Sequence, residues 1–468
     1  MNRRDFLAAG GAAAAGLAGS LLRAQNSATE AAAPITGTLT IDESTTLTTI
    51  PPDFIGLSYE SAQLANPAFF SADNAALIAI FRELSDQGVL RLGGGTSEFT
   101  AFTSAEPAGA APFDAVGPDT SKNIKADTPI TPKGLRNLRG FLDATGWRCL
   151  YGLNLGRGPV ERAAEEAWHA QAILGPRLIA FQLGNEPDAW RNRYRPATWT
   201  YGDYWKEWIL AHAAVTARVP QARFAGPDVS NKMAYVTGFA ADVKRSAPDV
   251  VMLTSHYYAM GPAGAVGMTI DRLLAPDPKL ERDLQTAMTA AREAGIPYRM
   301  SEGNTCWNGG QPGVSNTFAS ALWAVDTMLA FAAGGCSGFC LHGGGDGYYT
   351  PIAGGLKAGF VRRPEYFGVM AARNFAGATL IGSKLDCASD RVRAYAASRP
   401  GGRLTLIVNK AGAAAAIRTP LRRAKRQWQL AGPAIDARQG VTFTEGRVKA
   451  LHEGIAHVPA YSAILLES

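Results

Sequence analysis

The segment Leu178-Ile179-Ala180-Phe181-Gln182-Leu183-Gly184-Asn185-Glu186-Pro187-Asp188 decides how the rest of the chain is interpreted. Its apolar first half is typical of a fully buried β-strand. The strand must end near Pro187, because proline has no backbone N–H to donate to a sheet. The segment therefore predicts that the carboxylate of Glu186 lies at the tip of a buried strand, with the amide of Asn185 beside it.

A second segment has the same order of features. Pro297-Tyr298-Arg299-Met300-Ser301-Glu302-Gly303-Asn304 reads as a short strand followed by a glutamate and then Gly-Asn. Two carboxylates at strand tips are the pair that hydrolysis of a glycosidic bond requires. One carboxyl donates a proton to the leaving oxygen, and the other attacks the sugar or activates water.

Between residues 52 and 375, eight apolar stretches with strand character alternate with helical patterns. The predicted strands are residues 54–59, 89–94, 148–155, 178–186, 223–229, 250–258, 298–302 and 338–342. Eight parallel strands that alternate with helices are the number that closes a (β/α)8 TIM barrel. We therefore predict an α/β fold built on such a barrel.

Strand-sized segments return in residues 376–468 and predict a C-terminal β-sandwich. The alternating pattern of residues 34–51 predicts N-terminal strands that join this sandwich. The barrel is then residues 52–375, between the two. The long connection at residues 98–131 is rich in Gly, Pro, Asp and Ala, and we expect a loop over the barrel mouth.

Residues 1–33 are predicted to be a signal peptide and linker. Arg3-Arg4-Asp5-Phe6-Leu7 precedes an Ala/Gly-rich run, which resembles a twin-arginine (Tat) export signal. The run is too short and too rich in glycine to span a membrane. We expect a periplasmic or secreted protein without membrane association; an N-terminal helix of the mature fold is the alternative.

Composition narrows the possible partners. The net charge is +6, but the basic residues are spread out and are not interleaved with aromatic residues, so nucleic acid is not an expected partner. The five cysteines show no Cys-x-x-Cys or paired-histidine spacing of a zinc site. We therefore expect a carbohydrate as the partner, with no metal and no cofactor; the oligomeric state stays open.

The catalytic pair is predicted from its position. In TIM barrels the site is built from residues that follow the C-terminal ends of the strands, where Glu186 and Glu302 both lie. We predict that Glu186 is the general acid/base and Glu302 the nucleophile. A separation of about 5–5.5 Å between their carboxyls would give double displacement with retention.

The environment of each carboxyl should set its role. Trp190 and Phe181 are candidate apolar walls that would raise the pKa of the acid/base. Tyr258 and Arg299 are candidates to stabilise the ionised nucleophile by hydrogen bonding. The direction of Arg299 is open, because on a strand it shares the face of Ser301.

Other side chains at the predicted rim are candidates to contact the sugar. Asn185 could bind the 2-hydroxyl, although an Asx turn is the alternative. Trp307 and Tyr349 follow the seventh and eighth strands and could stack on a sugar ring, with Asn308 next to the tryptophan. His256 follows the sixth strand and is more simply explained as a structural histidine.

These residues resemble glycoside hydrolase family 79, which contains bacterial exo-β-glucuronidases and the heparanases. The resemblance covers nearly the whole chain after the predicted signal and is carried by residues 56–60, 90–94, 137–142, 182–187, 256–262, 302–306 and 313–323. It is greatest to the bacterial exo-β-glucuronidase branch. It implies that Glu186 is the acid/base and Glu302 the nucleophile.

The resemblance also implies contacts with the sugar. By this resemblance Glu60, Asn185 and Tyr258 contact the sugar, and Tyr258 lies near the nucleophile. In the connection after the second strand, Asp119 or the neighbouring Gly117 contacts ring hydroxyls.

Two positions depart from the bacterial branch. Trp307 stands where those glucuronidases have a tyrosine that helps to hold the uronate carboxylate. Asp346 lies in a shortened loop after the eighth strand, where a carboxylate would repel a uronate. We expect a retaining exo-β-glycosidase, specifically a β-glucuronidase. The alternatives are a neutral β-glycosidase similar to β-glucosidases or β-xylosidases, a heparanase-like endo-glucuronidase, and a non-catalytic sugar-binding barrel.

Overall fold

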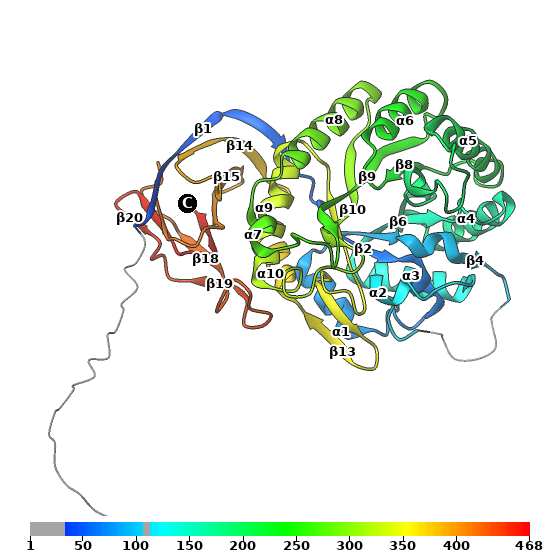
Figure 1. The fold of residues 1–468 in the computed structure, drawn as a ribbon, viewed down its shortest axis with the longest axis horizontal. Helices are drawn as coiled ribbons and strands as arrows, with labels where there is room; N and C mark the ends of the chain where they lie inside the picture. Colours follow the sequence, from blue (N-terminus) through cyan, green and yellow to red (C-terminus); the bar gives the residue numbers. More distant parts are fainter. Residues whose placement is uncertain (1–32, 106–112) are drawn as a thin grey trace, which may run out of the picture. The chain divides into compact units, whose positions relative to one another are not determined.

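The computed structural model describes residues 33–105 and 113–468. The predicted export signal lies outside the described residues, except for its last position. Eight parallel strands close into a barrel with helices around it (Figure 1). Their order around the barrel is β10-β11-β2-β3-β6-β7-β8-β9. They are β2 Ile55–Glu60, β3 Val89–Gly93, β6 Arg148–Leu153, β7 Leu178–Leu183, β8 Phe224–Val229, β9 Val250–Pro262, β10 Tyr298–Trp307 and β11 Phe339–His342. The predicted TIM barrel is confirmed.

Helices connect these strands. They are α1 Ala75–Leu84, α2 Pro118–Ser121, α3 Pro132–Thr145, α4 Val160–Leu174, α5 Tyr201–Arg218, α6 Met233–Ser246, α7 Ile270–Leu274, α8 Pro278–Ala294, α9 Phe318–Ala333 and α10 Pro364–Ala372. Helix α3 shows why they begin and end where they do. The Thr131 side chain accepts from Gly134 N, proline occupies the first turn, and Gly146 ends the helix at φ 81°.

Three strand ends differ from the prediction in ways that affect the site. Strand β7 ends at Leu183 instead of residue 186, because Gly184 takes φ 83° and leaves the extended conformation. Strands β9 and β10 continue past their predicted ends to Pro262 and Trp307, and the two pair in parallel as far as that point. The C-terminal ends of β9 and β10 therefore extend beyond the ends of the other barrel strands.

The barrel interior has an apolar layer below a polar one. The apolar layer is made by Val89, Leu150, Ala180, Ala225 and Cys340. Because side chains alternate along a strand, the residues two positions further on point to the same interior. Those residues include Arg91 on β3 and Gln182 on β7, which open the polar layer near the C-terminal ends of the strands.

The remaining strands form one ten-stranded sheet in the order β19-β18-β22-β16-β15-β14-β1-β17-β21-β20. They are β1 Ile35–Thr49, β14 Thr379–Cys387, β15 Val392–Arg399, β16 Gly402–Asn409, β17 Ala415–Arg418, β18 Arg426–Ala431, β19 Thr442–Gly446, β20 Leu451–His452, β21 Ile455–Val458 and β22 Ser462–Glu467. The N-terminal segment joins it as predicted. It is one strand, β1, antiparallel to β14 and parallel to β17 (Figure 1).

This sheet curls around a core of its own. Buried side chains from widely separated strands, such as Leu39 on β1, Ile407 on β16 and Val458 on β21, belong to one apolar cluster. The two layers expected of a sandwich therefore come from a single hydrogen-bonded sheet that folds over on itself.

The connection at residues 98–131 is more ordered than the predicted loop. Its described part contains β4 Thr100–Phe102 paired with β5 Thr128–Ile130, and the short helix α2. A further two-stranded sheet is made by β12 Ile352–Gly355 and β13 Gly359–Arg362. Within the described residues, no helix combines the length and apolar character needed to cross a membrane.

Candidate active site

Glu186 lies just past the end of β7 in an unusual backbone conformation. Its φ is 52°, in the left-handed region that residues with side chains seldom occupy. Its N–H donates to the carbonyl oxygen of Asp228 at 2.9 Å, and Pro187 starts a 3-10 turn, η4 Pro187–Ala189. Its side chain is 27% exposed, as a group that meets a substrate must be.

Glu302 lies within β10 and is more deeply held. Its carboxylate accepts hydrogen bonds from two sides: Tyr258 Oη donates to Oε1 at 2.8 Å, and Arg91 Nη1 donates to Oε2 at 2.5 Å. Only 7% of its side chain is exposed. Tyr258 therefore does what the sequence predicted for it, which is to donate to the carboxylate of Glu302.

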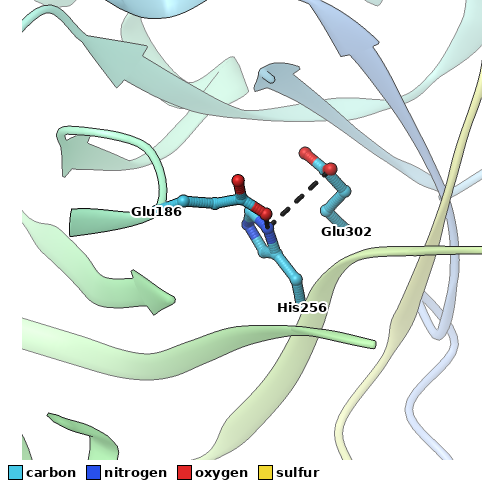
Figure 2. Close-up of side chains that lie close together, drawn as sticks. All are labelled: Glu186, His256 and Glu302. Carbon is cyan, nitrogen blue, oxygen red and sulfur yellow. Dashed lines mark hydrogen bonds and ion pairs between the residues drawn. The ribbon is translucent and has the colours of Figure 1, made fainter. Parts of the chain in front are cut away.

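The two glutamates face one another across the barrel. Figure 2 shows Glu186, His256 and Glu302 pointing toward a common centre, with oxygen or nitrogen atoms of all three within 4.8 Å of one another. His256 Nδ1 lies 3.1 Å from Glu186 Oε1 and 3.8 Å from Glu302 Oε1. A carboxylate oxygen of Glu186 and one of Glu302 therefore lie within 4.8 Å of one another.

Arg91 organises the floor of the site. Its fully buried guanidinium contacts the nucleophile candidate and four more side chains: Asp228 at 2.5 Å, Asn185 at 2.8 Å, Ser58 at 3.1 Å and Gln182 at 3.2 Å. A planar fork of five donors suits several oxygen acceptors at once. Arg91 thus links the tips of β2, β7, β8 and β10.

The surroundings of Glu302 favour its charged form. Burial by itself raises the pKa of this carboxyl, but His342, His256 and Arg91, with the hydrogen bond from Tyr258, lower it to about 2. Glu302 is therefore ionised at neutral pH, as a nucleophile must be.

The surroundings of Glu186 favour its neutral form. Burial raises the pKa of Glu186, and the negative charge of Glu302 raises it further, against the opposing effect of His256. Two neighbouring carboxyls with pKa values shifted in opposite directions are the arrangement that separates an acid from a nucleophile.

His256 supplies positive charge between the acids. Burial lowers its pKa, but Glu302 and Asp228 together raise it to about 10. Its Nε2 lies 3.3 Å from Asp228 Oδ1, close enough for an ion pair although poorly aligned for a hydrogen bond. Glu186, His256 and Glu302 are also the described residues that could together ligate a metal ion. A protonated imidazole has no free lone pair for a metal, so this charge state competes with metal binding.

A cavity of about 570 Å³ opens above the pair. Glu186, Glu302, Glu60 and His342 line its inner part, and Tyr258 and Tyr349 form part of its wall. Four cationic side chains also line the cavity: Lys122, Lys125, Arg193 and Lys279. The site therefore combines acids that have hydrogen-bond partners with several cationic side chains in the cavity wall.

The structure brings most of the predicted substrate residues to this cavity. Glu60, Tyr258, Trp307, Asn308 and Tyr349 all line it. Trp307 is 44% exposed, which leaves its ring available for stacking on a sugar or an aglycone. Glu60 accepts from Thr96 N at 2.9 Å through Oε2, while its Oε1 lies 3.5 Å from His342 Nε2.

Asn185 is close to the pair but is largely occupied. Its Oδ1 accepts from Arg91, and its backbone N–H donates to Glu98 Oε1 at 2.6 Å. Because the oxygen is taken, the amide NH2 is the end that remains for a sugar hydroxyl.

Gly117 and Asp119 support the wall of the cavity and do not line it. Gly117 packs against the loop after β11, where an added Cβ would lie 2.3 Å from Asp346 Oδ1. Asp119 binds Lys122 Nζ at 2.6 Å. Asp346 is itself exposed and accepts from the backbone N–H of Thr120, so its charge is directed to this loop.

Three residue-level expectations change with the structure. Arg299 donates to the carbonyls of Asp53 and Phe54 at the opposite end of the barrel, so Arg91 does what was considered for Arg299. Phe181 faces the helices and packs near Phe224, not against the acid/base. Trp190 supports the segment that carries Glu186, since its Nε1 donates to Asn185 O at 2.8 Å.

The network residues Arg91 and Gln182 were not predicted as site residues. A signal for Arg91 was present: an arginine within the apolar run Val89-Leu90-Arg91-Leu92 must find partners if it is buried. Gln182 carried the same signal in β7, one strand-period before the Gly-Asn-Glu tip.

The chain is similar in sequence to two curated proteins. It is 28% identical to a β-glucuronidase of Aspergillus niger over 74% of this chain and 66% of that protein. It is 24% identical to a β-glucuronidase of Neurospora crassa over 61% of this chain and 56% of that protein. The chain therefore spans less than two thirds of the length of either relative. No protein-family model matches it.

Solved structures support the fold. A 4-O-α-L-rhamnosyl-β-D-glucuronidase from Fusarium oxysporum superposes with a TM-score of 0.70 at 16% identity, over 92% of this chain and 100% of that one. A family 51 arabinofuranosidase from Xanthomonas axonopodis pv. citri gives a TM-score of 0.69 at 14% identity, over 93% and 99% of the two chains. At such low identity the likeness establishes the shared architecture alone.

Proposed function

We propose that this chain is a retaining exo-β-glycosidase that removes terminal β-linked glucuronate. The observation that carries the reaction class is the Glu186–Glu302 pair, within 4.8 Å at the C-terminal rim and with opposed pKa shifts. Both the separation and the opposed ionisation are what a double displacement requires.

In the first step, the ionised Glu302 attacks the anomeric carbon while Glu186 protonates the glycosidic oxygen. The bond to the leaving group breaks and a glycosyl ester on Glu302 forms. Arg91 and Tyr258 orient the attacking carboxylate. His256, next to both glutamates, stabilises the negative charge that Glu186 acquires as it loses its proton.

In the second step, Glu186 acts as a base. It takes a proton from a water molecule whose oxygen attacks the anomeric carbon, and the ester to Glu302 breaks. The sugar leaves with its original anomeric configuration, and Glu186 is again protonated for the next cycle.

An anionic sugar is supported by the charge of the cavity. Lys125, Arg193 and Lys279 line it together with Lys122, which Asp119 neutralises, and the charge of Glu302 is neutralised by Arg91. Such a distribution attracts a negatively charged substrate into the mouth. Asp346 accepts from the backbone N–H of Thr120 and is not among the residues that line the cavity, which reduces the repulsion expected from the sequence.

The exo mode is supported by a tie between two segments that line the cavity. Lys122 Nζ donates to the carbonyl oxygen of Asn308 at 2.9 Å and also binds Asp119. These contacts join the connection before α3 to the segment after β10. A polysaccharide running through the site would have to break this tie, whereas a chain end would not.

The named relatives support the same sugar, since both similar curated proteins are β-glucuronidases. We place the chain beside the bacterial exo-β-glucuronidase branch of glycoside hydrolase family 79. The paired-arginine segment at Arg3-Arg4 further supports export by the Tat route, to the periplasm or outside the cell. Trp307 occupies the position at which the bacterial exo-β-glucuronidases have a tyrosine. This difference favours a neutral β-glycoside as the alternative substrate.

The test is a panel of aryl β-glycosides with one leaving group and different sugars. We expect the highest kcat/KM with the glucuronide, and proton NMR should show the β-anomer as the first product. Glu302→Gln should lower kcat by roughly 10⁴-fold or more, because no nucleophile remains, while sugar binding persists. Glu161→Gln, on the exposed face of α4, is the control and should match the unmodified protein.

Each outcome of the panel has a definite meaning. Faster turnover of the glucoside or xyloside would replace the glucuronide with a neutral substrate. An α-anomer as the first product would rule out the double-displacement mechanism. Sugar binding without turnover of any glycoside would indicate the non-catalytic barrel.

A further inference from the structure

A third carboxylate, that of Glu98, lies under the acid/base loop. It belongs to the 3-10 turn η2 Gly95–Phe99, directly after β3, and is 1% exposed. Its Oε1 accepts from Asn185 N at 2.6 Å. Its Oε2 accepts from Leu155 N at 3.1 Å and from Gly156 N at 2.5 Å. Glu98 therefore holds the backbones that follow both β6 and β7.

The backbone that Glu98 holds is the one that most needs support. Glu186 has φ 52° and Gly184 has φ 83°, so the tip of β7 makes two left-handed steps within three residues. Such conformations persist only where the surroundings enforce them. The N–H of Asn185, between these two residues, is bound by Glu98, and the N–H of Glu186 is bound by Asp228 O.

We propose that Glu98 is a positioning residue for the acid/base. Its ionised carboxylate holds the backbone from which Glu186 projects, so the charge on Glu98 decides how well Glu186 is aimed at the glycosidic oxygen. This inference rests on the role proposed above for Glu186.

The site around Glu98 explains why its charge can change. The charged or titratable groups that interact electrostatically with Glu98 are Arg195, Tyr194 and Tyr204. Arg157 lies over the ring of the adjacent Phe99, and Glu186 follows Asn185, whose N–H Glu98 accepts. Arg195 donates to Gly156 O at 2.7 Å and pairs with Glu207, so it reaches Glu98 only through space. No side-chain cation among the described residues bonds the carboxylate directly, and the groups that donate to it are the backbone N–H groups of Asn185, Leu155 and Gly156.

The titration of Glu98 then has a defined sign. Burial raises its pKa to about 7, against the lowering effect of the three backbone donors and Arg195. Above pH 7 the carboxylate accepts all three N–H groups. Below pH 7 one carboxyl oxygen of Glu98 carries a proton. Its O–H then faces a backbone N–H, and because both groups are donors, a hydrogen bond is lost and the loop loosens.

Folding stability should respond in the opposite direction. The pKa of Glu98 is higher in the folded state than in the unfolded chain, so the folded state binds the proton more tightly. The stability that this residue provides is therefore complete below pH 4.5 and is lost as the pH rises through 7. The folded protein is therefore less stable when Glu98 is charged, although the charged form positions Glu186 better.

The experiment compares two glucuronides that differ in leaving group. A 2,4-dinitrophenolate leaves without protonation, whereas an alkoxide needs the acid. In Glu98→Gln, an amide NH2 replaces one carboxylate oxygen. A donor then faces a backbone N–H that needs an acceptor. We expect kcat/KM for the alkyl glucuronide to fall at least tenfold more than for the dinitrophenyl glucuronide, with little change in KM. The alkyl substrate should also lose the activity change near pH 7 that the unmodified protein shows.

The chain offers a matched control. Glu166 is also buried, with its pKa raised to about 7 by burial, but it accepts from Tyr151 Oη at 2.7 Å on the outer side of β6. Glu166→Gln should therefore leave the ratio between the two substrates unchanged.

A second variant covers the case in which Glu98→Gln does not fold. In Gly156→Ala the new Cβ would lie 2.8 Å from Glu98 Oε2, so it displaces the carboxylate without removing its charge. It should change the ratio between the substrates in the same direction, and a near-ultraviolet circular dichroism spectrum confirms that each variant is folded.

The outcomes separate the two proposals. If the unmodified protein hydrolyses neither glucuronide nor any other β-glycoside, the proposed function fails and this inference fails with it. If the protein is active but Glu98→Gln and Gly156→Ala show the same substrate ratio as Glu166→Gln, or if no activity change occurs near pH 7, only the role of Glu98 is overturned.

Discussion

Glu186 and Glu302 are chemically identical side chains that differ in their ionisation because of their contacts. Glu302 accepts from Arg91 and Tyr258, which lowers its pKa, whereas Glu186 has only His256 to oppose the effect of burial. The same fold thus gives two residues of one type opposite pKa shifts, as the proposed acid and nucleophile roles require.

The role of Glu186 predicts a specific rescue. In Glu186→Ala we expect kcat/KM for an alkyl glucuronide to fall roughly 10²–10⁴-fold, the usual contribution of a general acid. A dinitrophenyl glucuronide should still form the ester on Glu302, because its leaving group needs no proton. Added azide should then raise turnover, since this small anion attacks the ester without a base.

The product of that reaction checks the assignment. Mass spectrometry and NMR should show a β-glucuronosyl azide, formed by attack on the face that Glu186 occupied. An α-azide, or no response to azide, would contradict the acid/base role. The exposed Glu161→Ala provides the control.

At the scale of elements, α9 is the helix on which the barrel and the curled sheet both depend. Fourteen residues of Phe318–Ala333 are buried, which is why its sequence is apolar on every side. Its neighbour α10 approaches it at a glycine. A Cβ on Gly368 would lie 2.2 Å from the carbonyl oxygen of Ala321, so only glycine fits this crossing.

Gly368→Ala should therefore destabilise the protein by about 1–3 kcal/mol or more, the usual cost of overpacking a core. The measurement is thermal denaturation followed by circular dichroism. The control is Gly202→Ala in the first turn of α5, where the nearest atom to the new Cβ is 3.8 Å away. That variant should be neutral or slightly more stable, and equal effects of the two substitutions would contradict the close crossing.

At the scale of the whole molecule, a buried ion pair connects the barrel to the sheet. Asp326 on α9 accepts from Lys410 Nζ at 2.6 Å, just after β16, and from Tyr395 Oη on β15 at 2.7 Å. Its side chain is 12% exposed and that of Lys410 is 7% exposed. Removal of one partner would leave the other charge buried and unpaired.

We expect Lys410→Met to cost about 3–5 kcal/mol of unfolding free energy, and Lys410→Met combined with Asp326→Leu to cost clearly less. Burial raises the pKa of Asp326, but Lys410 and Tyr395 outweigh it and lower the pKa below 3.8. The pair's contribution is therefore present above pH 3.8 and lost as the pH falls through the lowered value. Thermal denaturation of the single and double variants at several pH values measures both effects; additive costs would show that the two charges are not coupled.

Local sequence patterns were sufficient to predict the features that repeat along the chain. Strand and helix periods identified the barrel strands to within a few residues, and the Asn-Glu-Pro and Ser-Glu-Gly-Asn tips identified the proposed catalytic pair. Strand ends were less predictable, because β9 and β10 extend through pairing with each other and β7 stops through a left-handed turn.

The groups that surround Glu186 and Glu302 could be identified only from the tertiary structure. Arg91 meets Glu302 across 211 residues of chain, and Glu98 reaches Asn185 across 87. Neither partner follows from a local period, because the barrel's closure brings the strand tips together. The same closure turned Arg299 toward the opposite end of the barrel. The chemistry of a side chain is written in the sequence, but its charge state depends on burial and on neighbours that only the folded chain supplies.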